Sequence, residues 1–223
     1  MTSNAFTRAG KPANLIRFAV GASIVTVAAL AAAPAFADQE SEARTPAIAA
    51  ARSVEQKDAG QVTAQSVLKI AESQVGVSEN AAGGGTPFHS WYMASQRAKE
   101  TVARDGGSLT AYANAPWCAM FVSWVGEQAG ARPTVGWDAY TVTYAKWFES
   151  NGRWGDAAKP GAVVFYSWDD RSISSIDHVG LVKQDNGDGT ITAIEGNTGN
   201  GKVEERVRPK SQVVGYGYPE YKA

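Results

Sequence analysis

Hydrophobic positions follow a helical spacing between residues 63 and 150 and a strand spacing after residue 160. Apolar residues three or four positions apart predict amphipathic helices, whereas short β-branched or aromatic runs between turn residues predict strands. The expected helices span 63–76, 87–105, 117–130 and 140–150. The expected strands span 162–166, 177–184, 190–195, 202–207 and 213–218. Helices first and antiparallel strands afterwards indicate an α+β fold.

Three helix starts are marked by residues that favour a first turn. Thr63 precedes the first apolar pattern, and Thr86 is followed by Pro87, which suits the first helical position. Pro116 stands just before the third helical pattern. Cys118 is therefore expected in the first turn of that helix, pointing toward whatever the helix packs on.

The first 37 residues have the pattern of an export signal. A basic start is followed by an apolar stretch over 18–33 and by the small-x-small sequence Ala35-Phe36-Ala37. The apolar stretch is short, which favours a cleaved signal over a lasting membrane anchor. Residues 38–62 lack sustained periodicity, so we expect a flexible spacer there and one domain over 63–223.

Composition narrows the class of protein. The chain is 44% hydrophobic and 19% charged with a formal net charge of −1, which excludes wholesale disorder and gives no electrostatic footprint for nucleic acid. We expect a secreted protein, extracellular or associated with a cell wall, that is monomeric and not inserted in a membrane after cleavage of its signal.

The single cysteine, Cys118, cannot form a disulfide within its own chain. A free thiol in an exported protein indicates either a buried small hydrophobe or a chemical use. At a helix N-terminus, unpaired backbone N–H groups and the helix dipole favour thiolate over thiol, so Cys118 is a candidate nucleophile. The same N–H groups could hold the oxyanion of a tetrahedral intermediate.

A cysteine nucleophile needs a base, and the sequence offers only His89 and His178. His89 lies early in a predicted helix among aromatic residues and is interpreted as a packed or surface histidine. His178 lies in a predicted strand, where Gly180 would leave room for another backbone to approach. If the strands form a meander, His178 faces Glu195 on the next strand, and Asn197 projects from the same face as Glu195 if strand geometry continues.

Four blocks of the sequence follow one another in a recognisable order. They are Pro116-Trp117-Cys118-Ala119-Met120-Phe121-Val122, Pro160-Gly161-Ala162-Val163-Val164-Phe165, His178-Val179-Gly180-Leu181-Val182 and Ile194-Glu195-Gly196-Asn197. Together they closely resemble the CHAP domain, the cysteine- and histidine-dependent amidohydrolase/peptidase family of cell-wall hydrolases. The resemblance extends over roughly residues 64–218.

This resemblance implies a papain-like α+β fold, in which N-terminal helices pack on an antiparallel sheet, and cleavage of amide bonds in peptidoglycan. By position, Cys118 matches the nucleophile, His178 the base, Glu195 the orienting carboxylate and Asn197 an accessory polar residue. One departure is Ala162, because the family often has an acidic residue after the Pro-Gly turn. That position is interpreted as structural.

Two alternatives remain open. An NlpC-type endopeptidase would share the fold and the Cys-His pair but commonly uses a second histidine, and no histidine follows His178. A catalytically silent wall-binding or scaffold protein could retain the same fold. The sequence does not distinguish a muramoyl-alanine amidase from a peptide endopeptidase.

The sequence has seven tryptophans, some of which could line a groove for the substrate. Trp137 and Trp168 are predicted in loops beside the site, and Trp117 is adjacent to the candidate nucleophile, so these three are the substrate-binding candidates. Tyr112 and Asn114 precede Cys118 at a position where papain-like enzymes place an oxyanion donor, and the sequence does not choose between them.

No cofactor or metal is expected. Two separated histidines and one cysteine do not make a zinc site. The sequence Asp185-Asn186-Gly187-Asp188-Gly189 lacks the spacing and the terminal glutamate of a calcium loop, so it is interpreted as a hairpin turn.

Overall fold

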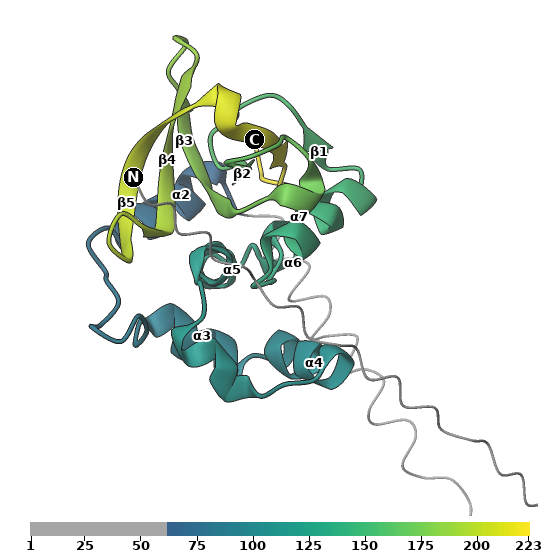
Figure 1. The fold of residues 1–223 in the computed structure, drawn as a ribbon. Helices are drawn as coiled ribbons and strands as arrows, with labels where there is room; N and C mark the ends of the chain where they lie inside the picture. The colour runs from purple at the N-terminus through teal and green to yellow at the C-terminus, as the bar shows by residue number, and fades with distance from the viewer. Residues whose placement is uncertain (1–61) are drawn as a thin grey trace, which may run out of the picture. The chain divides into compact units, whose positions relative to one another are not determined.

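The computed structural model describes residues 62–223 (Figure 1). The predicted export signal over 1–37 lies outside the described residues, as does the predicted spacer apart from Val62. Within 62–223 the helices come first and the strands follow, which confirms the α+β class. Over these residues, no helix has the length and apolar character that a membrane crossing requires.

The helices begin mostly where the capping residues predict. They are α2 (Ala64–Glu72), α3 (Pro87–Ala94), α4 (Gln96–Asp105), α5 (Cys118–Gln128), α6 (Arg132–Val135) and α7 (Thr141–Ser150). Thr63 and Thr86 both act as N-caps. The single helix expected over 87–105 is wrong: Ser95 has an extended backbone and its side chain caps α4, which separates α3 from α4.

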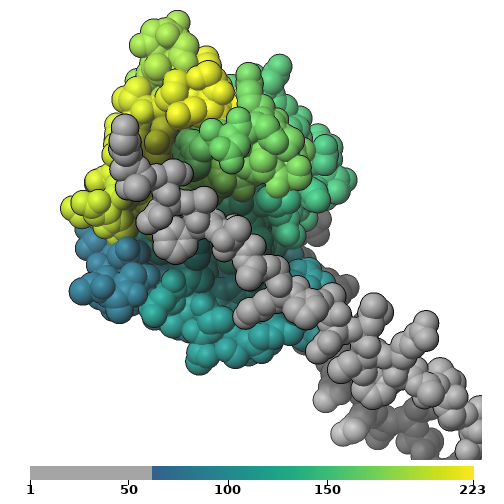
Figure 2. Space-filling view, in the orientation of Figure 1, coloured from purple at the N-terminus to yellow at the C-terminus, as the bar shows by residue number. Residues whose placement is uncertain are grey.

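The strands form one antiparallel sheet in the order β1-β6-β2-β3-β4-β5. They are β1 (Trp154–Gly155), β2 (Val163–Tyr166), β3 (His178–Asp185), β4 (Thr190–Thr198), β5 (Lys202–Pro209) and β6 (Val213–Gly217). Strands β2 to β5 are a meander, and β6 returns to pair with β2. The turn after Asp185 joins β3 to β4 as predicted and projects at the top of Figures 1 and 2.

Helix α5 packs against β3 and β4, and α2, α3 and α6 pack against α5 (Figure 1). Gly196 on β4 permits the close approach of α5, because a Cβ there would lie 2.6 Å from the Cβ of Phe121. Figure 2 shows the helical part, blue to teal, below the green-to-yellow strands. The arrangement is compatible with a papain-like fold and places the start of α5 at the end of the sheet.

Candidate active site

Cys118 is the first residue of α5 and is 5% exposed. The N-cap residue of α5, Trp117, makes no side-chain capping hydrogen bond. The backbone N–H groups of the first turn therefore have neither an intrahelical partner nor a side-chain cap, and they remain available to an anion. The sulfur lies where the helix dipole favours negative charge.

His178 is the first residue of β3 and lies beside both Glu195 and Cys118. Its Nε2–H donates to Oε2 of Glu195 at 3.0 Å, which leaves Nδ1 available to Cys118, a residue that lines the same cavity. Burial by itself lowers the pKa of the His178 ring, but the hydrogen bonds to Cys118 and Glu195 outweigh it and raise that pKa to about 9. The ring therefore holds its proton at neutral pH, beside the sulfur.

Glu195 on β4 is fully buried. It reaches His178 because Gly180, between them, has no side chain: a Cβ there would lie 2.8 Å from Cγ of Glu195 and 3.0 Å from the carbonyl oxygen of Ile194. The sequence predicted that the absence of a side chain at Gly180 leaves room for a neighbouring backbone. In the structure that room also holds the side chain of Glu195.

Arg208, near the end of β5, is a residue of this site that the sequence did not predict. Its Nε lies 3.0 Å from Oε1 of Glu195, and its Nη2 lies 2.6 Å from Oε2. Burial tends to raise the pKa of Glu195, but the hydrogen bonds from His178 and Arg208 lower it to about 2. Several lysines and arginines occupy β5, and no spacing rule selects the one that meets Glu195.

Two cavities meet at Cys118. One, of about 200 Å³, is lined by Tyr112, Met120 and Tyr140, and the other, of about 290 Å³, is lined by Trp168, His178, Asn197 and Arg208. Cys118 and Asp177 line both cavities. The sulfur therefore lies at the junction of two spaces that could hold the two sides of a bond.

Asn197 lines the larger cavity, but not for the reason expected. The register of β4 with β5 shifts between Glu195 and Thr198, and Asn197 has a positive φ of 55°. Strand alternation therefore fails at this point, and the bulge places Asn197 in the cavity.

Residues 110–197 match the family model of the CHAP domain. The resemblance inferred from the sequence is confirmed for this segment, and a CHAP domain indicates amidase or peptidase action on peptidoglycan. The matched segment contains Cys118, His178, Glu195 and Asn197, whereas Arg208 lies outside it. A search of curated proteins and a search of solved structures found no match.

Of the two candidate oxyanion donors in the CHAP segment, only Tyr112 lines the cavity at Cys118. Its hydroxyl lies 3.5 Å from that of Tyr140, another residue of the same wall. Asn114 is exposed, and its side-chain oxygen lies where a Cβ of Gly84 would stand, against the loop before α3. Tyr112 is therefore the better placed side chain.

The three tryptophan candidates have different surroundings. Trp168 is 47% exposed, lines the larger cavity and stacks on His178 with ring centroids 6.0 Å apart. Trp117 is fully buried, and its Nε1 donates to Glu79. Trp137 lines a separate cavity with Trp147. Neither Trp117 nor Trp137 lines either of the two cavities at Cys118, so of the three candidates Trp168 is the one that borders them.

His89 is a structural residue, as its sequence context indicates. It is 1% exposed, and its ring nitrogens contact Thr86 Oγ1 at 2.7 Å and the carbonyl oxygen of Ala115 at 3.0 Å. These contacts tie the start of α3 to the loop that precedes Cys118. Among residues 62–223, no three metal-ligating side chains cluster together.

Proposed function

We propose that this protein is a secreted cysteine hydrolase that cleaves amide bonds in bacterial peptidoglycan. The observation that carries the proposal is the Cys118–His178–Glu195 arrangement, in which a cysteine at a helix start shares a cavity with an imidazole that is hydrogen-bonded to a buried carboxylate. In this proposal Cys118 is the nucleophile, His178 the proton carrier and Glu195 its orienting partner. Asn197 and Trp168 contact the substrate in the larger cavity.

The proposed reaction is acyl transfer in two halves. The Cys118 thiolate attacks the amide carbonyl, and the oxyanion is held by first-turn N–H groups together with the Tyr112 hydroxyl. His178 gives its proton to the leaving amine, and the C–N bond breaks to leave a thioester on Cys118. His178 then takes a proton from water, the resulting hydroxide attacks the thioester, and the acid product leaves as the sulfur regains its charge.

In this proposal the position of His178 determines how the substrate lies. His178 lines only the larger of the two cavities, whereas Tyr112 lines only the smaller. The amine that receives the proton therefore occupies the larger cavity, and the acyl group occupies the smaller one.

The contact between His178 and Glu195 favours the CHAP mechanism over the NlpC-type alternative, because a carboxylate and not a second histidine orients the base. We also propose that residues 1–37 direct export and that 38–62 are a spacer to the catalytic domain. Mass spectrometry of fragments released from purified peptidoglycan would identify the cleaved bond, since each candidate bond leaves a different new amine.

Replacement of the nucleophile tests the proposal directly. Cys118→Ala should lose nearly all clearing of a cell-wall suspension, because no other side chain at the site can form the acyl-enzyme. Clearing by the wild-type protein should also be abolished by alkylation, which can modify only this cysteine. Circular dichroism shows whether the variant is folded. A folded Cys118→Ala protein that clears the wall as fast as wild type would establish a non-cysteine mechanism.

A further inference from the structure

We propose that Arg208 is a positioning residue of this site, which fixes the Glu195 carboxylate so that His178 is held in its working orientation toward Cys118. The role rests on the proposed function and adds to it a residue beyond the matched CHAP segment.

Both oxygens of Glu195 are held by Arg208. The guanidinium meets the carboxylate as a fork, and the carboxylate also accepts from His178. The side chain of Glu195 has no exposed surface and that of Arg208 is only 16% exposed, so water contributes little to the ionised carboxylate. A buried carboxylate with the imidazole as its only partner would be poorly compensated and free to rotate.

Arg208 also contacts the rings that cover His178. Its guanidinium carbon lies 5.3 Å from the ring centroid of Trp168 and 5.7 Å from that of Tyr166. Both rings stack on His178, with centroids 6.0 and 5.9 Å from the imidazole. One cation therefore supports the imidazole through its carboxylate partner and through the aromatic residues beside it.

The charge of Arg208 affects each titrating group around it. The titratable groups around Arg208 come from several elements. They are Glu195, His178, Cys118 and Asp177 at the site, Tyr166 on β2, and Glu204 on β5. The cation tends to lower the pKa of Glu195 and that of Tyr166, so its removal should make both groups bind protons more tightly. The acid limb of any activity that depends on the ionised Glu195 should then move to higher pH.

The rate of Cys118 alkylation by iodoacetamide, measured against pH, tests the role without any substrate. Arg208→Gln should move the acid limb of this profile to higher pH than in the wild type, because the loss of the cation beside Glu195 makes that carboxylate bind protons more tightly. Arg208→Lys keeps the charge and should keep the limb in place, although it loses the fork and should lower the rate of wall clearing. Arg206→Gln is the matched control, because Arg206 lies two residues away on β5 and pairs with Glu204 instead of Glu195.

A double-substitution cycle shows whether Arg208 acts through Glu195. In a Glu195→Gln background, the further change Arg208→Gln should lose most of its effect on the alkylation profile. The proposal is overturned if Arg208→Gln leaves the profile like that of Arg206→Gln, or if its shift is equally large in the Glu195→Gln background. Should the single Arg208→Gln variant not fold, Arg208→Lys replaces it, and wall clearing by Arg208→Lys equal to that of wild type would overturn the role of the fork. Absence of wall clearing by the wild type, with the alkylation shift intact, would reject the hydrolase function and leave this role standing.

Discussion

At the residue scale, identical side chains acquire different roles from their neighbours. Trp168 stacks on His178 and borders the cavity at Cys118, whereas Trp137 lies under the guanidinium of Arg132, 4.9 Å from the ring centroid. Both are tryptophans in loops. Contact with the cavity makes one of them a candidate for substrate binding and the other a matched control.

Trp168→Ala should raise KM about two- to tenfold, because an aromatic contact contributes about 0.5–1.5 kcal/mol. Its effect on thermal stability should be smaller, since the side chain is half-exposed. Trp137→Ala should leave KM unchanged. Steady-state kinetics on a soluble peptidoglycan fragment give both values, and equal KM values for the two variants would remove Trp168 from the substrate site.

At the element scale, two glycines determine how closely secondary structures approach. Gly196 allows α5 to lie on β4, and Gly180 allows the side chain of Glu195 to lie against β3, within reach of His178. Neither requirement involves a special backbone angle, since neither glycine has a positive φ. A side chain at either position would displace an element that carries part of the site.

Gly180→Ala should lower both stability and clearing. The added Cβ would overlap Cγ of Glu195, and overpacking of this kind costs about 1–3 kcal/mol. Gly180→Val should be worse than alanine, because its branches extend further into the same space. Urea unfolding and wall clearing measured on both variants provide the check. Wild-type clearing by a folded Gly180→Val protein would contradict the packing argument.

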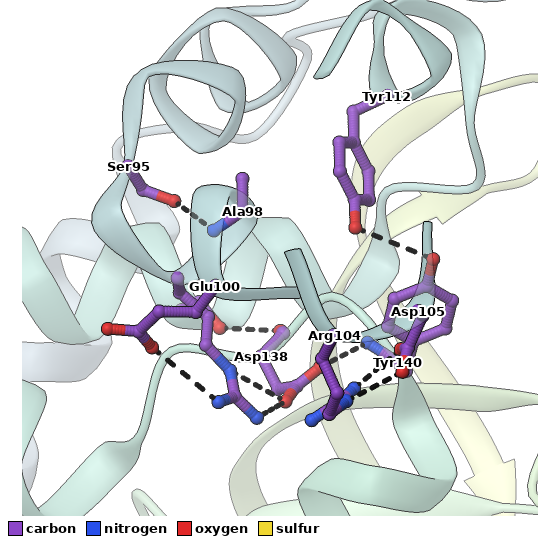
Figure 3. A network of polar contacts seen from close by, with 10 residues as sticks. Ser95, Ala98, Glu100, Arg104, Asp105, Tyr112, Asp138 and Tyr140 are labelled. Atoms are coloured by element: carbon purple, nitrogen blue, oxygen red, sulfur yellow. Dashed lines mark hydrogen bonds and ion pairs between the residues drawn. The ribbon is translucent and has the colours of Figure 1, made fainter. Parts of the chain in front are cut away.

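At the scale of the whole molecule, a polar network connects the helical part to the cavity wall. Asp138 accepts hydrogen bonds from Nε of Arg97 on α4 at 3.1 Å and from the backbone N–H of Tyr140 at 2.9 Å. Ser123 on α5 donates to the Asp138 carbonyl at 2.8 Å. Figure 3 shows Asp138 within this network and the hydroxyl of Tyr140 facing that of Tyr112. The network therefore fixes the loop that forms the wall of the smaller cavity.

Asp138→Asn should destabilise the protein by about 1.5–3 kcal/mol, the range for a hydrogen bond to a charged group. The Asp138 side chain is only 7% exposed, so solvent does not replace the lost ion pair with Arg97. Asp105→Asn is the control, because Asp105 and its partner Arg104 are both about half-exposed and such pairs contribute little. Urea unfolding should separate the two variants clearly, and equal stabilities would show that the Asp138 network does not support the fold.

Much of the fold was predictable because local signals are strong where the chain begins a helix or turns. The N-caps Thr63 and Thr86 and the hairpin turn after Asp185 each depend on residues only a few positions away in the sequence. The division between α3 and α4 was missed, because the helical spacing continues across Ser95 while its side chain caps a new helix. The burial of Trp117 depends on Phe88 and Glu79, which lie far from it in sequence.

The sequence by itself determined the α+β order, the place of Cys118 at a helix start, and the His178 and Glu195 blocks that resemble the CHAP domain. These features depend on short-range periodicity, capping and motif spacing. Only the tertiary structure decided that Arg208 holds Glu195, that a bulge carries Asn197 into the cavity, and that Tyr112 and not Asn114 borders Cys118. Those choices depend on strand register and on contacts between distant segments, which the local pattern of residues does not encode.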